Sequence, residues 1–504
     1  MTYKIPKEVL EALEKLEGAG YEAYLVGGCV RDTLLSREPN DWDITTNARP
    51  EEIQKVFEKT FYENDFGTVG VVTESDNPAL KVIEITPYRM EAKYTDKRHP
   101  DIIRFADKLE EDLKRRDFTV NAIALNISPA AYVSDLKAKE TGEIDEKFVK
   151  IIDLWKGKED LEKKIIKTVG VPKERFEEDA LRLMRAVRLA AELKFSIDKE
   201  TQKAISEKAH LLRMISKERI RDEFSKIIMS DNPREGVQNL QKFGILKYAA
   251  PEIEEGMDIT QNKEHIYTVW EHNLRALSHA AEKKYPMDIR MAALLHDVGK
   301  PRTKVGDGPD STFYNHEVVG AKIVAQVLSN LRYPKNFIEK VIKLVRWHLF
   351  FSDTEVITLS AVRRVTKNVG PENIWDLMKV RFCDRVGMGR PKEEPYRLRK
   401  YESMVEEALR SPLSVSMLKI NGAKIMEITK LQAGPKIGYT LHTLFEEVLD
   451  DPALNTEEYL EKRAKELCQF SDEKLQELGT AGKHKKEEEE SKEISKIRQK
   501  YGVR

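Results

Sequence analysis

The sequence predicts an α+β N-terminal domain followed by an all-α remainder, and two patterns support this fold class. Alternating apolar segments, which are typical of strands, are concentrated in the first 150 residues. Beyond about residue 155, apolar positions recur at helical spacing, with Gly or Pro at the breaks. A chain of 504 residues is long enough for about three to four domains.

The head, residues 1–150, is expected to contain a mixed sheet. Its predicted helices cover 7–17, a short segment from about residue 30, and 50–59; its predicted strands cover 23–26, 42–45, 70–73, 82–88 and 118–126.

Four regions are expected after the head. Residues 151–250 form an elongated helical neck and body, with predicted helices over 160–168, 175–193, 199–208, 217–229 and 234–243. Residues 255–400 form a histidine-rich helical domain and residues 401–475 a helical tail. Residues 476–504 are a charge run, to which we assign no function.

The composition excludes some classes of protein and leaves others open. Lys and Arg number 86 and Asp and Glu 87, so the net charge of −1 argues neither for nor against a nucleic-acid partner. Three widely spaced cysteines exclude a disulfide framework and a cysteine zinc site. No apolar run approaches the ~18 residues of a membrane span. We therefore expect a cytoplasmic protein with no membrane partner.

Gly27 and Gly28 follow a predicted strand and precede a helix that carries Arg31. Glycines at such a position let backbone N–H groups approach a phosphate closely. Taken alone the pair is weak evidence, because most Gly-Gly pairs after strands are simply turns.

Asp41 and Asp43 open the next predicted strand, and side chains two apart on a strand face the same side. Two such carboxylates repel each other unless a cation joins them, and they suit two Mg²⁺ ions ~3.5–4 Å apart. A solvated Asp pair would be the commoner interpretation without Gly27 and Gly28 nearby. Together the two features favour nucleotidyl transfer.

Arginines and aspartates recur in two later segments. Arg115, Arg116 and Asp117 lie between a helix end and a strand, where they could simply cap the helix and pair with each other. In the predicted helix over 175–193, four charged residues are spaced by three: Asp179, Arg182, Arg185 and Arg188. This stripe fits an ordinary solvent-exposed helix face with a surface ion pair. A carboxylate beside a guanidinium group, however, also matches the hydrogen-bonding edge of a base.

Five segments resemble, in order, the motifs of the bacterial class II tRNA nucleotidyltransferase (CCA-adding enzyme) and poly(A) polymerase family. They are LVGGCVRD, DWDITTNA, RRDFTVNAIA, the trio Asp153, Gly157 and Asp160, and EDALRLMRAVRLA. The resemblance covers roughly residues 20–245 and implies a nucleotidyltransferase head. It also implies that Asp41 and Asp43 are the catalytic Mg²⁺ ligands.

The same resemblance implies roles for the remaining polar residues. Gly28 and Arg31 would hold the triphosphate, and Arg116 and Asp117 would lie near the ribose and incoming nucleotide. Asp179 and Arg182 would form a protein template for C and then A. Arg185 and Arg188 would help to bind the nucleotide. The segment 87–101 resembles the flexible loop of enzymes that add the terminal A.

The histidine-rich region contains ligand types that suit a metal site on successive helices. The candidates are His272, His296, Asp297, His316, His348 and Asp384. A lone buried histidine is more often a satisfied core residue, but the adjacent His296 and Asp297 favour a metal. The pattern resembles the HD-domain metal-dependent phosphohydrolases over about 264–385. Mn, Ni, Fe, Co and Mg all remain open as the metal.

Three further residues accompany this pattern. Lys300 would either meet a phosphate or be a solvated lysine, and His265 and His279 lie near the candidate ligands in sequence. Further on, residues 423–455 resemble the C-terminal segment of these nucleotidyltransferases, which implies either a tRNA contact or a packing module.

We therefore expect an enzyme that adds C, C and then A to the 3′ end of tRNA from CTP and ATP. Its HD domain would hydrolyse 2′,3′-cyclic or 3′ phosphates. The alternatives in the same class are an A-adding tRNA nucleotidyltransferase and a poly(A) polymerase. An alternative of another class is an HD nucleotide phosphohydrolase whose N-terminal half only binds RNA.

Overall fold

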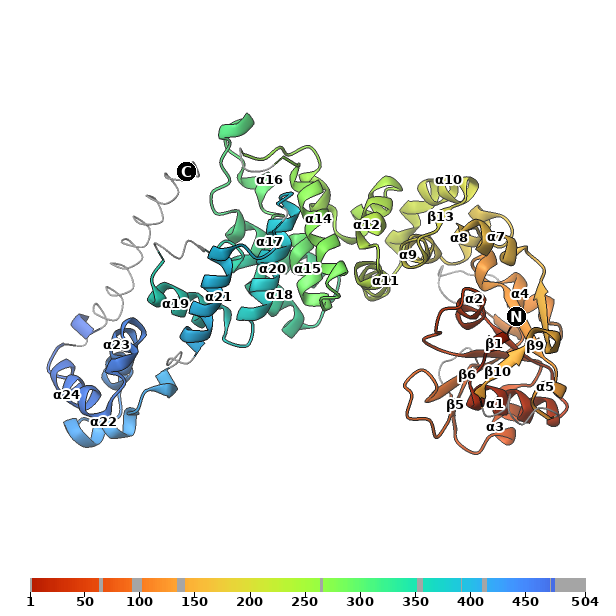
Figure 1. The fold of residues 1–504 in the computed structure, drawn as a ribbon, viewed down its shortest axis with the longest axis horizontal. Coiled ribbons are helices and arrows are strands. Elements are labelled where there is room, and N and C mark those ends of the chain that lie inside the picture. Colours follow the sequence, from red (N-terminus) through yellow and green to blue (C-terminus); the bar gives the residue numbers. More distant parts are fainter. Residues whose placement is uncertain are drawn as a thin grey trace. The chain divides into compact units, whose positions relative to one another are not determined.

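The computed structural model divides into two compact units, Met1–Ala249 and Ala250–Arg504, which we describe separately. Figure 1 shows a strand-rich N-terminal region and helices throughout the rest of the chain. The structure describes residues 2–62, 67–92, 102–133, 141–262, 266–350, 357–390, 392–409, 415–471 and 473–475. The expected α+β head and helical remainder are confirmed.

The head is built on a mixed sheet in the order β11-β9-β2-β3-β6-β5-β4. At its centre, β2 (Ala23–Val26) pairs antiparallel with β3 (Asp43–Thr46), and β3 pairs parallel with β6 (Val82–Pro87). The outer strands are β4 (Thr60–Tyr62), β5 (Val69–Val72), β9 (Ile123–Ile127) and β11 (Val149–Asp153). Two small pairs lie apart from it: β1 (Thr2–Lys4) with β10 (Glu143–Asp145), and β7 (Arg89–Ala92) with β8 (Ile102–Phe105).

The helices of the head are short, and their apolar spacing explains their packing. In α1 (Lys7–Gly18), the residues Val9, Leu13 and Leu16 are almost wholly buried, because positions three and four apart share one face. The other helices are α2 (Gly28–Leu34), α3 (Pro50–Val56), α4 (Leu109–Lys114) and α5 (Ala130–Val133).

Two predicted strands begin later than expected. The strand predicted over 42–45 starts at Asp43, so Asp41 precedes it, and the strand predicted over 118–126 starts at Ile123. In the second case the 3₁₀ turn Thr119–Asn121 comes first, and the side chain of Asp117 accepts a hydrogen bond from Asn121 Nδ2 at 3.2 Å. Short side-chain bonds of this kind compete with strand pairing.

The neck and body complete the first unit. Their helices are α7 (Gly157–Lys163), α8 (Pro172–Glu178), α9 (Arg182–Leu193), α10 (Lys199–Lys208), α11 (Lys217–Met229), α12 (Pro233–Lys242) and α13 (Leu246–Ala249). The short parallel pair β12 (Ile165–Ile166) and β13 (Ser196–Ile197) occurs where only helix was expected. The continuous helix predicted over 175–193 is wrong, because Asp179 is extended, with φ −135° and ψ 107°.

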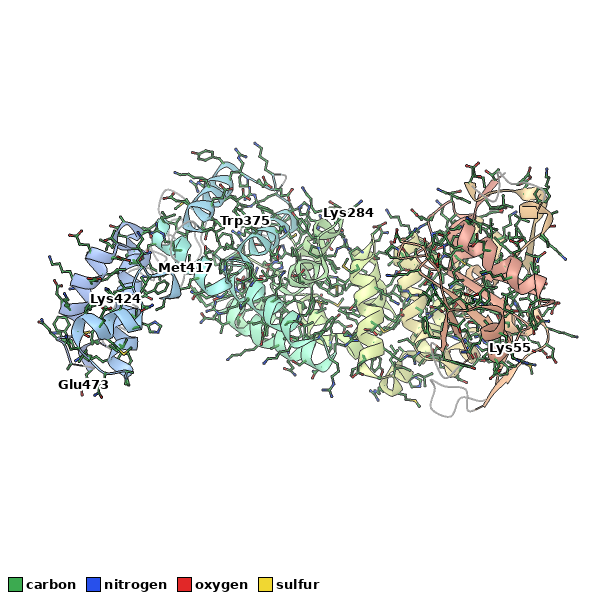
Figure 2. The ribbon with its side chains drawn as sticks, turned by 90° about the horizontal axis from the view of Figure 1, so that it is seen from below. Lys55, Lys284, Trp375, Met417, Lys424 and Glu473 are labelled. Atoms are coloured by element: carbon green, nitrogen blue, oxygen red, sulfur yellow. The ribbon has the colours of Figure 1, made fainter. Side chains whose placement is uncertain are left out.

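In the second unit, five helices surround the histidine-rich centre. They are α14 (Val269–Glu282), α15 (Met287–Leu295), α17 (His316–Asn330), α18 (Lys335–Trp347) and α20 (Ile374–Gly387). The shorter α16 (Lys300–Thr303) follows α15, while α19 (Leu359–Val369) and α21 (Tyr396–Leu409) continue toward the tail. Figure 2 shows the side chains on these helices, with Trp375 of α20 labelled.

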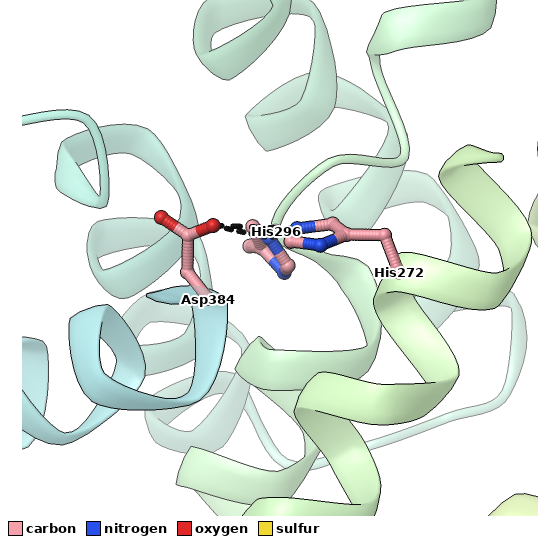
Figure 3. A group of neighbouring side chains, drawn as sticks. All are labelled: His272, His296 and Asp384. Carbon is pink, nitrogen blue, oxygen red and sulfur yellow. Dashed lines mark hydrogen bonds and ion pairs between the residues drawn. The ribbon is translucent and has the colours of Figure 1, made fainter. Parts of the chain in front are cut away.

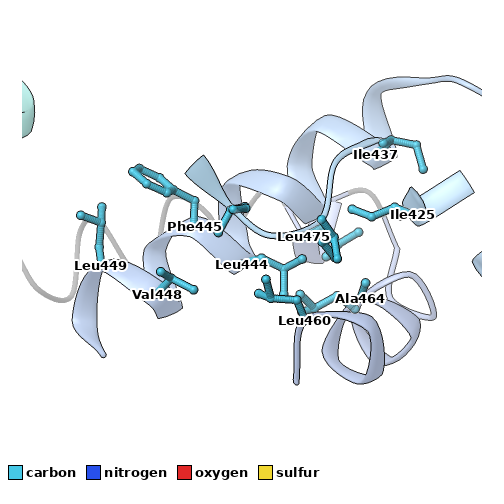
Figure 4. Close-up of a cluster of buried hydrophobic side chains, with 12 residues drawn as sticks. Ile425, Ile437, Leu444, Phe445, Val448, Leu449, Leu460, Ala464 and Leu475 are labelled. Atoms are coloured by element: carbon cyan, nitrogen blue, oxygen red, sulfur yellow. The ribbon is translucent and has the colours of Figure 1, made fainter. Parts of the chain in front are cut away.

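The C-terminal tail has an apolar core of its own (Figure 4). Leu444 and Val448 of α23 (Pro435–Asp450) meet Leu460 of α24 (Glu457–Leu467) and Ile425 of α22 (Gly422–Thr429), and all four are fully buried. Among the described residues, no helix has the length and hydropathy that a bilayer crossing needs. The charge run 476–504, residues 93–101 of the expected flexible loop, and His265 lie outside the described residues.

Candidate functional site

Gly27 and Gly28 lie at the centre of the polar cluster in the head. A Cβ atom on Gly27 would stand 3.0 Å from Asp43 Oδ2 and 3.2 Å from Arg116 Nη1. A Cβ atom on Gly28 would stand 3.8 Å from Asp41 Oδ1 and 3.7 Å from Arg31 Nη2. Gly27 also has a φ of 82°, a value that strains residues with a side chain. The structure thus places two carboxylates and two guanidinium groups around this glycine pair.

Asp41 and Asp43 flank Trp42, which is only 3% exposed and anchors the segment in the core. Asp41 is exposed and Asp43 half-buried, so both are within reach of a ligand from solvent. Carboxylate oxygens are the donors that Mg²⁺ prefers, and the pair therefore fits such ions.

Glu84 was missed by sequence reasoning and lies beside this pair. In the parallel pairing of β3 and β6 it stands opposite Asp43, and its N–H donates to the Trp42 carbonyl at 3.1 Å. Paired residues of neighbouring strands face the same side of the sheet, so Glu84 is a third candidate metal ligand. An acidic residue within the apolar strand sequence VIEITP was the available signal.

The arginines of the head are held in place by carboxylate and amide groups. Arg31 donates from Nε to Asp32 Oδ1 at 3.0 Å and from Nη1 to Asn121 Oδ1 at 2.8 Å. Arg185 reaches from α9 to Asp117, donating from Nε to Oδ2 at 2.7 Å. Burial alone would raise the pKa of Asp117, but the neighbouring guanidinium groups of Arg185 and Arg182 hold it below its ordinary value.

Asp179 and Arg182 flank the break between α8 and α9, so the expectation that they lie one turn apart on a single helix is wrong. Asp179 accepts from the Leu181 N–H at 2.9 Å and from Arg219 Nη2 of α11 at 3.0 Å. The Asp179 carboxylate caps the break through the Leu181 bond, and local bonding of this kind interrupts helices.

Arg182 is oriented by groups on both sides. It donates from Nη1 to Glu178 Oε2 at 2.7 Å and from Nη2 to the Arg115 carbonyl at 3.0 Å. Only 8% of Arg182 is exposed, and Arg188 is equally buried, ion-paired with Glu223 at 2.8 Å. A solvent-exposed helix face, considered for this stripe from the sequence, is therefore wrong for Arg182 and Arg188, while Asp179 and Arg185 are partly exposed. The partners Glu178, Glu223 and Arg219 were also missed by sequence reasoning.

The motif of Asp153, Gly157 and Asp160 joins the body to the head. The Asp153 carboxylate accepts from the Gly157 N–H at 2.8 Å, and Asp160 Oδ2 accepts from the Thr119 hydroxyl at 2.6 Å. A Cβ atom on Gly157 would lie 2.1 Å from the Thr119 carbonyl oxygen, so only glycine fits there. This joint lies within two residues of Asp117.

The second cluster collects histidine and aspartate side chains from the ends of several helices. Two groups have ligand atoms within 4.8 Å of one another: His272, His296 and Asp384, and Asp297, His316 and His348. All six expected ligands therefore converge in the structure. Figure 3 shows the first group, with the Asp384 carboxylate directed at His296.

Asp297 lies between the two groups. Its Oδ2 atom is 3.2 Å from His272 Nε2 and 3.4 Å from His296 Nε2, and its Oδ1 atom is 3.2 Å from His316 Nε2. His348 Nε2 follows at 3.5 Å from the same Oδ1 atom. A carboxylate with one oxygen toward each group is suited to bridge two cations.

Backbone carbonyls fix the orientation of three of these imidazole rings. The Nδ1 atoms of His296, His316 and His348 lie 2.8, 2.7 and 2.7 Å from the carbonyl oxygens of residues 293, 313 and 345. This arrangement makes Nδ1 the donor and leaves Nε2 as a ligand atom, as is usual for metal-binding histidines. The buried Nε2 atoms of His316 and His348 face Asp297 Oδ1, and no described residue donates a hydrogen bond to either atom. The donor set therefore fits divalent metal ions.

The charges of this cluster perturb one another. Burial would lower the pKa of His272, but hydrogen bonds to Asp297 and Asp384 raise it to about 9. Lys300 is 6% exposed, and its Nζ lies 2.6 Å from Asp297 Oδ2 and donates to Gln261 Oε1 at 2.6 Å. The solvated lysine considered from the sequence is therefore wrong. His279 lies apart from both groups, with Nε2 3.1 Å from Glu393 Oε1.

Known protein families match three stretches of the chain. Residues 23–167 match the poly A polymerase head domain, residues 194–257 the probable RNA and SrmB-binding site of polymerase A, and residues 264–396 the HD domain. The fold and the two clusters thus define a nucleotidyltransferase-type head joined to an HD domain.

Individual relatives narrow this class. The chain is 46% identical over 237 residues to a CCA-adding enzyme of Limosilactobacillus reuteri, and 44% identical over 249 residues to that of Lactococcus lactis. These alignments cover 47% and 49% of this chain but only 53% and 57% of the relatives, about half of their length. The crystal structure of the Bacillus stearothermophilus CCA-adding enzyme in complex with CTP superposes with a TM-score of 0.67 at 27% identity, covering 91% of this chain and 96% of that one. The chain is thus similar to poly(A) polymerases in its head domain and to CCA-adding enzymes over about half of the length of those curated relatives.

Proposed function

We propose that the protein is a tRNA nucleotidyltransferase that adds C, C and then A to the 3′ end of tRNA from CTP and ATP. One observation carries the proposal: Asp41, Asp43, Arg31 and Arg116 all surround the pair Gly27 and Gly28. Such an arrangement suits a metal-bound nucleoside triphosphate. The Bacillus stearothermophilus relative, whose structure contains CTP, supports the choice of substrate.

In this proposal Asp41, Asp43 and Glu84 hold Mg²⁺ at the entrance of β3. When bound, the ions activate the tRNA 3′-hydroxyl and offset charge on the α-phosphate. Arg31 and Arg116 bind the triphosphate, and their ion pairs with Asp32 and Asp112 keep both guanidinium groups in fixed orientations. Gly28 lets the backbone approach the phosphates.

The base is read by the residues around the break after α8. Arg182 supplies N–H donors and Asp179 carboxylate acceptors, which together complement a base edge. Asp117 lies between the two ends of the nucleotide, at the ribose, and is held there by Arg185. Arg188 pairs with Glu223 in the middle of α11 and so acts on the nucleotide only indirectly.

A single assay tests the proposed activity against its rivals. A tRNA transcript ending at the discriminator base is incubated with CTP alone, ATP alone, or both. Two added Cs from CTP, followed by one A, support the proposal. Addition of A only to a transcript already ending in CC would indicate an A-adding enzyme, and long A tails would indicate a poly(A) polymerase.

A second activity is proposed for the HD domain, namely hydrolysis of 2′,3′-cyclic or 3′ phosphates at RNA ends. Its support is the pair of ligand groups that meet at Asp297, whose donors suit Mn, Ni, Fe or Co, or Mg. The measurement is release of phosphate from a transcript with a 2′,3′-cyclic end, together with bound metal per chain. His296→Ala should lose phosphate release and hold less metal per chain, whereas Asp43→Ala should keep both at the wild-type level.

The same pair of variants tests a phosphohydrolase whose N-terminal half only binds RNA. Under that alternative, Asp43→Ala leaves every activity intact, which would contradict the transferase. The tRNA 3′ end, CTP and ATP remain the proposed partners, and a cytoplasmic location remains a prediction.

A further inference from the structure

Asp112 is a buried carboxylate between the two ends of the nucleotide site. It lies on α4 and its side chain has 0% exposure, which is unusual for an aspartate. It binds no part of the proposed substrate, and the sequence motifs gave it no role. Its position in the structure suggests one.

The two carboxylate oxygens of Asp112 serve different arginines. Oδ1 accepts from Arg115 Nε at 2.9 Å and from Arg115 Nη2 at 2.6 Å, and Oδ2 accepts from Arg116 Nη2 at 3.2 Å. Burial would raise the pKa of Asp112, but both guanidinium groups lower it, so the group is ionised at neutral pH. A buried charge of this kind keeps its partners in one geometry, because losing either is costly.

Arg115 and Arg116 contact different ends of the proposed nucleotide site. Arg116 Nη1 lies 3.2 Å from the place of a Gly27 Cβ atom, which is itself 3.0 Å from Asp43 Oδ2, so Arg116 belongs to the metal end. The Arg115 carbonyl accepts from Arg182 Nη2 at 3.0 Å, so the Arg115 backbone orients the base-reading guanidinium.

We propose that Asp112 is a positioning residue that fixes the phosphate-binding Arg116 and the base-reading Arg182 in orientation relative to each other. The proposal rests on the transferase function proposed above. Without the Asp112 charge, Arg115 no longer fixes the end of α4, and the carbonyl that orients Arg182 becomes mobile. Base selection and triphosphate binding then weaken together.

A merely structural role for Asp112 makes a different prediction. Loss of folded protein lowers the rates with all nucleotides by one factor, so the ratio of two rates does not change. A positioning role changes that ratio, because the correct base depends on Arg182 more than a wrong base does. The selectivity for CTP over UTP, measured as a ratio of kcat/KM values, is therefore the decisive quantity.

The experiment compares wild type, Asp112→Asn and the control Glu110→Gln, an exposed residue on the same helix. Asp112→Asn should lower the CTP-to-UTP ratio about tenfold, corresponding to loss of one well-placed base contact, and should raise the KM for CTP. Glu110→Gln should leave the ratio unchanged. In an Arg182→Ala background, Asp112→Asn should cause no further loss of selectivity.

An unchanged ratio in folded Asp112→Asn, with active wild type, would overturn this proposal and leave the transferase function standing. If Asp112→Asn does not fold, Arg115→Lys decides, because it keeps a cation but loses the paired N–H donors; a fall in the ratio supports the proposal and an unchanged ratio overturns it. A wild-type chain that adds no nucleotide would overturn both proposals.

Discussion

In the head, the candidate metal ligands Asp41 and Asp43 lie at an open strand entrance, whereas the six ligands of the HD domain are at most 6% exposed. The head supplies carboxylates surrounded by arginines, and the HD domain supplies imidazoles oriented by backbone carbonyls. The two clusters therefore suit ions with different residence times: Mg²⁺ that enters with a nucleotide, and metal that stays in the folded domain.

The difference lies in how each cluster satisfies its polar groups before a ligand arrives. Arg31, Arg185 and Asp117 already have partners within the protein. In the HD domain, the buried Nε2 atoms of His316 and His348 face only the Asp297 carboxylate, at 3.2 and 3.5 Å, and receive no hydrogen bond from a described residue; a buried acceptor left in this way costs about 1–3 kcal/mol. Metal should therefore contribute to folding stability in the second unit far more than in the first.

The largest effect should follow from Asp43→Ala. Loss of a metal-binding carboxylate beside Gly27 should lower nucleotide addition by about a thousandfold or more, because preorganised charge at the reacting atoms is removed. Addition rates on a tRNA transcript measure it, with the exposed Asp76→Ala as control. Equal rates for Asp43→Ala and wild type would contradict the assignment of the head site.

Metal removal should change the thermal stability of the HD domain but not that of the first unit. Chelation should lower the thermal midpoint of the HD domain, because resident metal at a hundred times its Kd adds about 2.7 kcal/mol to folding. The transition of the first unit should stay in place. Scanning calorimetry with and without chelator measures both transitions, and equal shifts in the two would remove the contrast between the sites.

His348→Ala should show whether the two ligand groups of the HD domain hold separate metal ions. It removes one ligand of the group that contains Asp297 and His316 but none of the group that contains His272. Bound metal per chain should fall by about half, as expected when one of two ions loses a ligand and Asp297 still serves the other. Metal analysis of the purified chain measures it; an unchanged content would show that the two groups do not hold separate ions.

Arg219→Ala should have a smaller effect, on base selection. Arg219 holds Asp179 at 3.0 Å, so its loss should lower the CTP-to-UTP selectivity by a factor of about three to ten, the lower range for one base contact. Arg221→Ala on the same helix, whose guanidinium pairs with Asp222, is the matched control. If both variants keep wild-type selectivity, Asp179 does not need Arg219.

The smallest effect concerns pH. Because the folded pKa of Asp117 is depressed, its contribution to stability is present above its unfolded value of about 3.9 and is lost as pH falls through the folded pKa. Denaturant unfolding of the first unit should show a weaker slope below pH 4 in Asp117→Asn than in wild type. Identical slopes would contradict the pairing with Arg185.

The sequence predicted the fold class and most of the residues that meet, because strand and helix periodicity and motif spacing are local signals. The break at Asp179 was not predicted, since the apolar pattern of 175–193 continues through it and only the side-chain bond to Leu181 interrupts the helix. Glu84, Asp112 and Arg219 were missed because their roles depend on register and on contacts between distant segments.

The convergence of Asp297 with both histidine groups could be expected from the sequence only as a ligand set. Its two oxygens face different groups because segments far apart in the sequence converge at Asp297, and no local pattern contains that information. The corrected interpretation of Lys300 has the same origin, because its burial depends on Gln261 from an earlier segment.

The most direct test of the account is the 3′ sequence of a tRNA transcript lacking CCA after incubation with the wild-type chain, CTP, ATP and Mg²⁺. We predict two Cs and one A with both nucleotides, two Cs with CTP alone, and no extension by Asp43→Ala. Unextended transcript with the wild-type chain, or the same extension by Asp43→Ala, would contradict it.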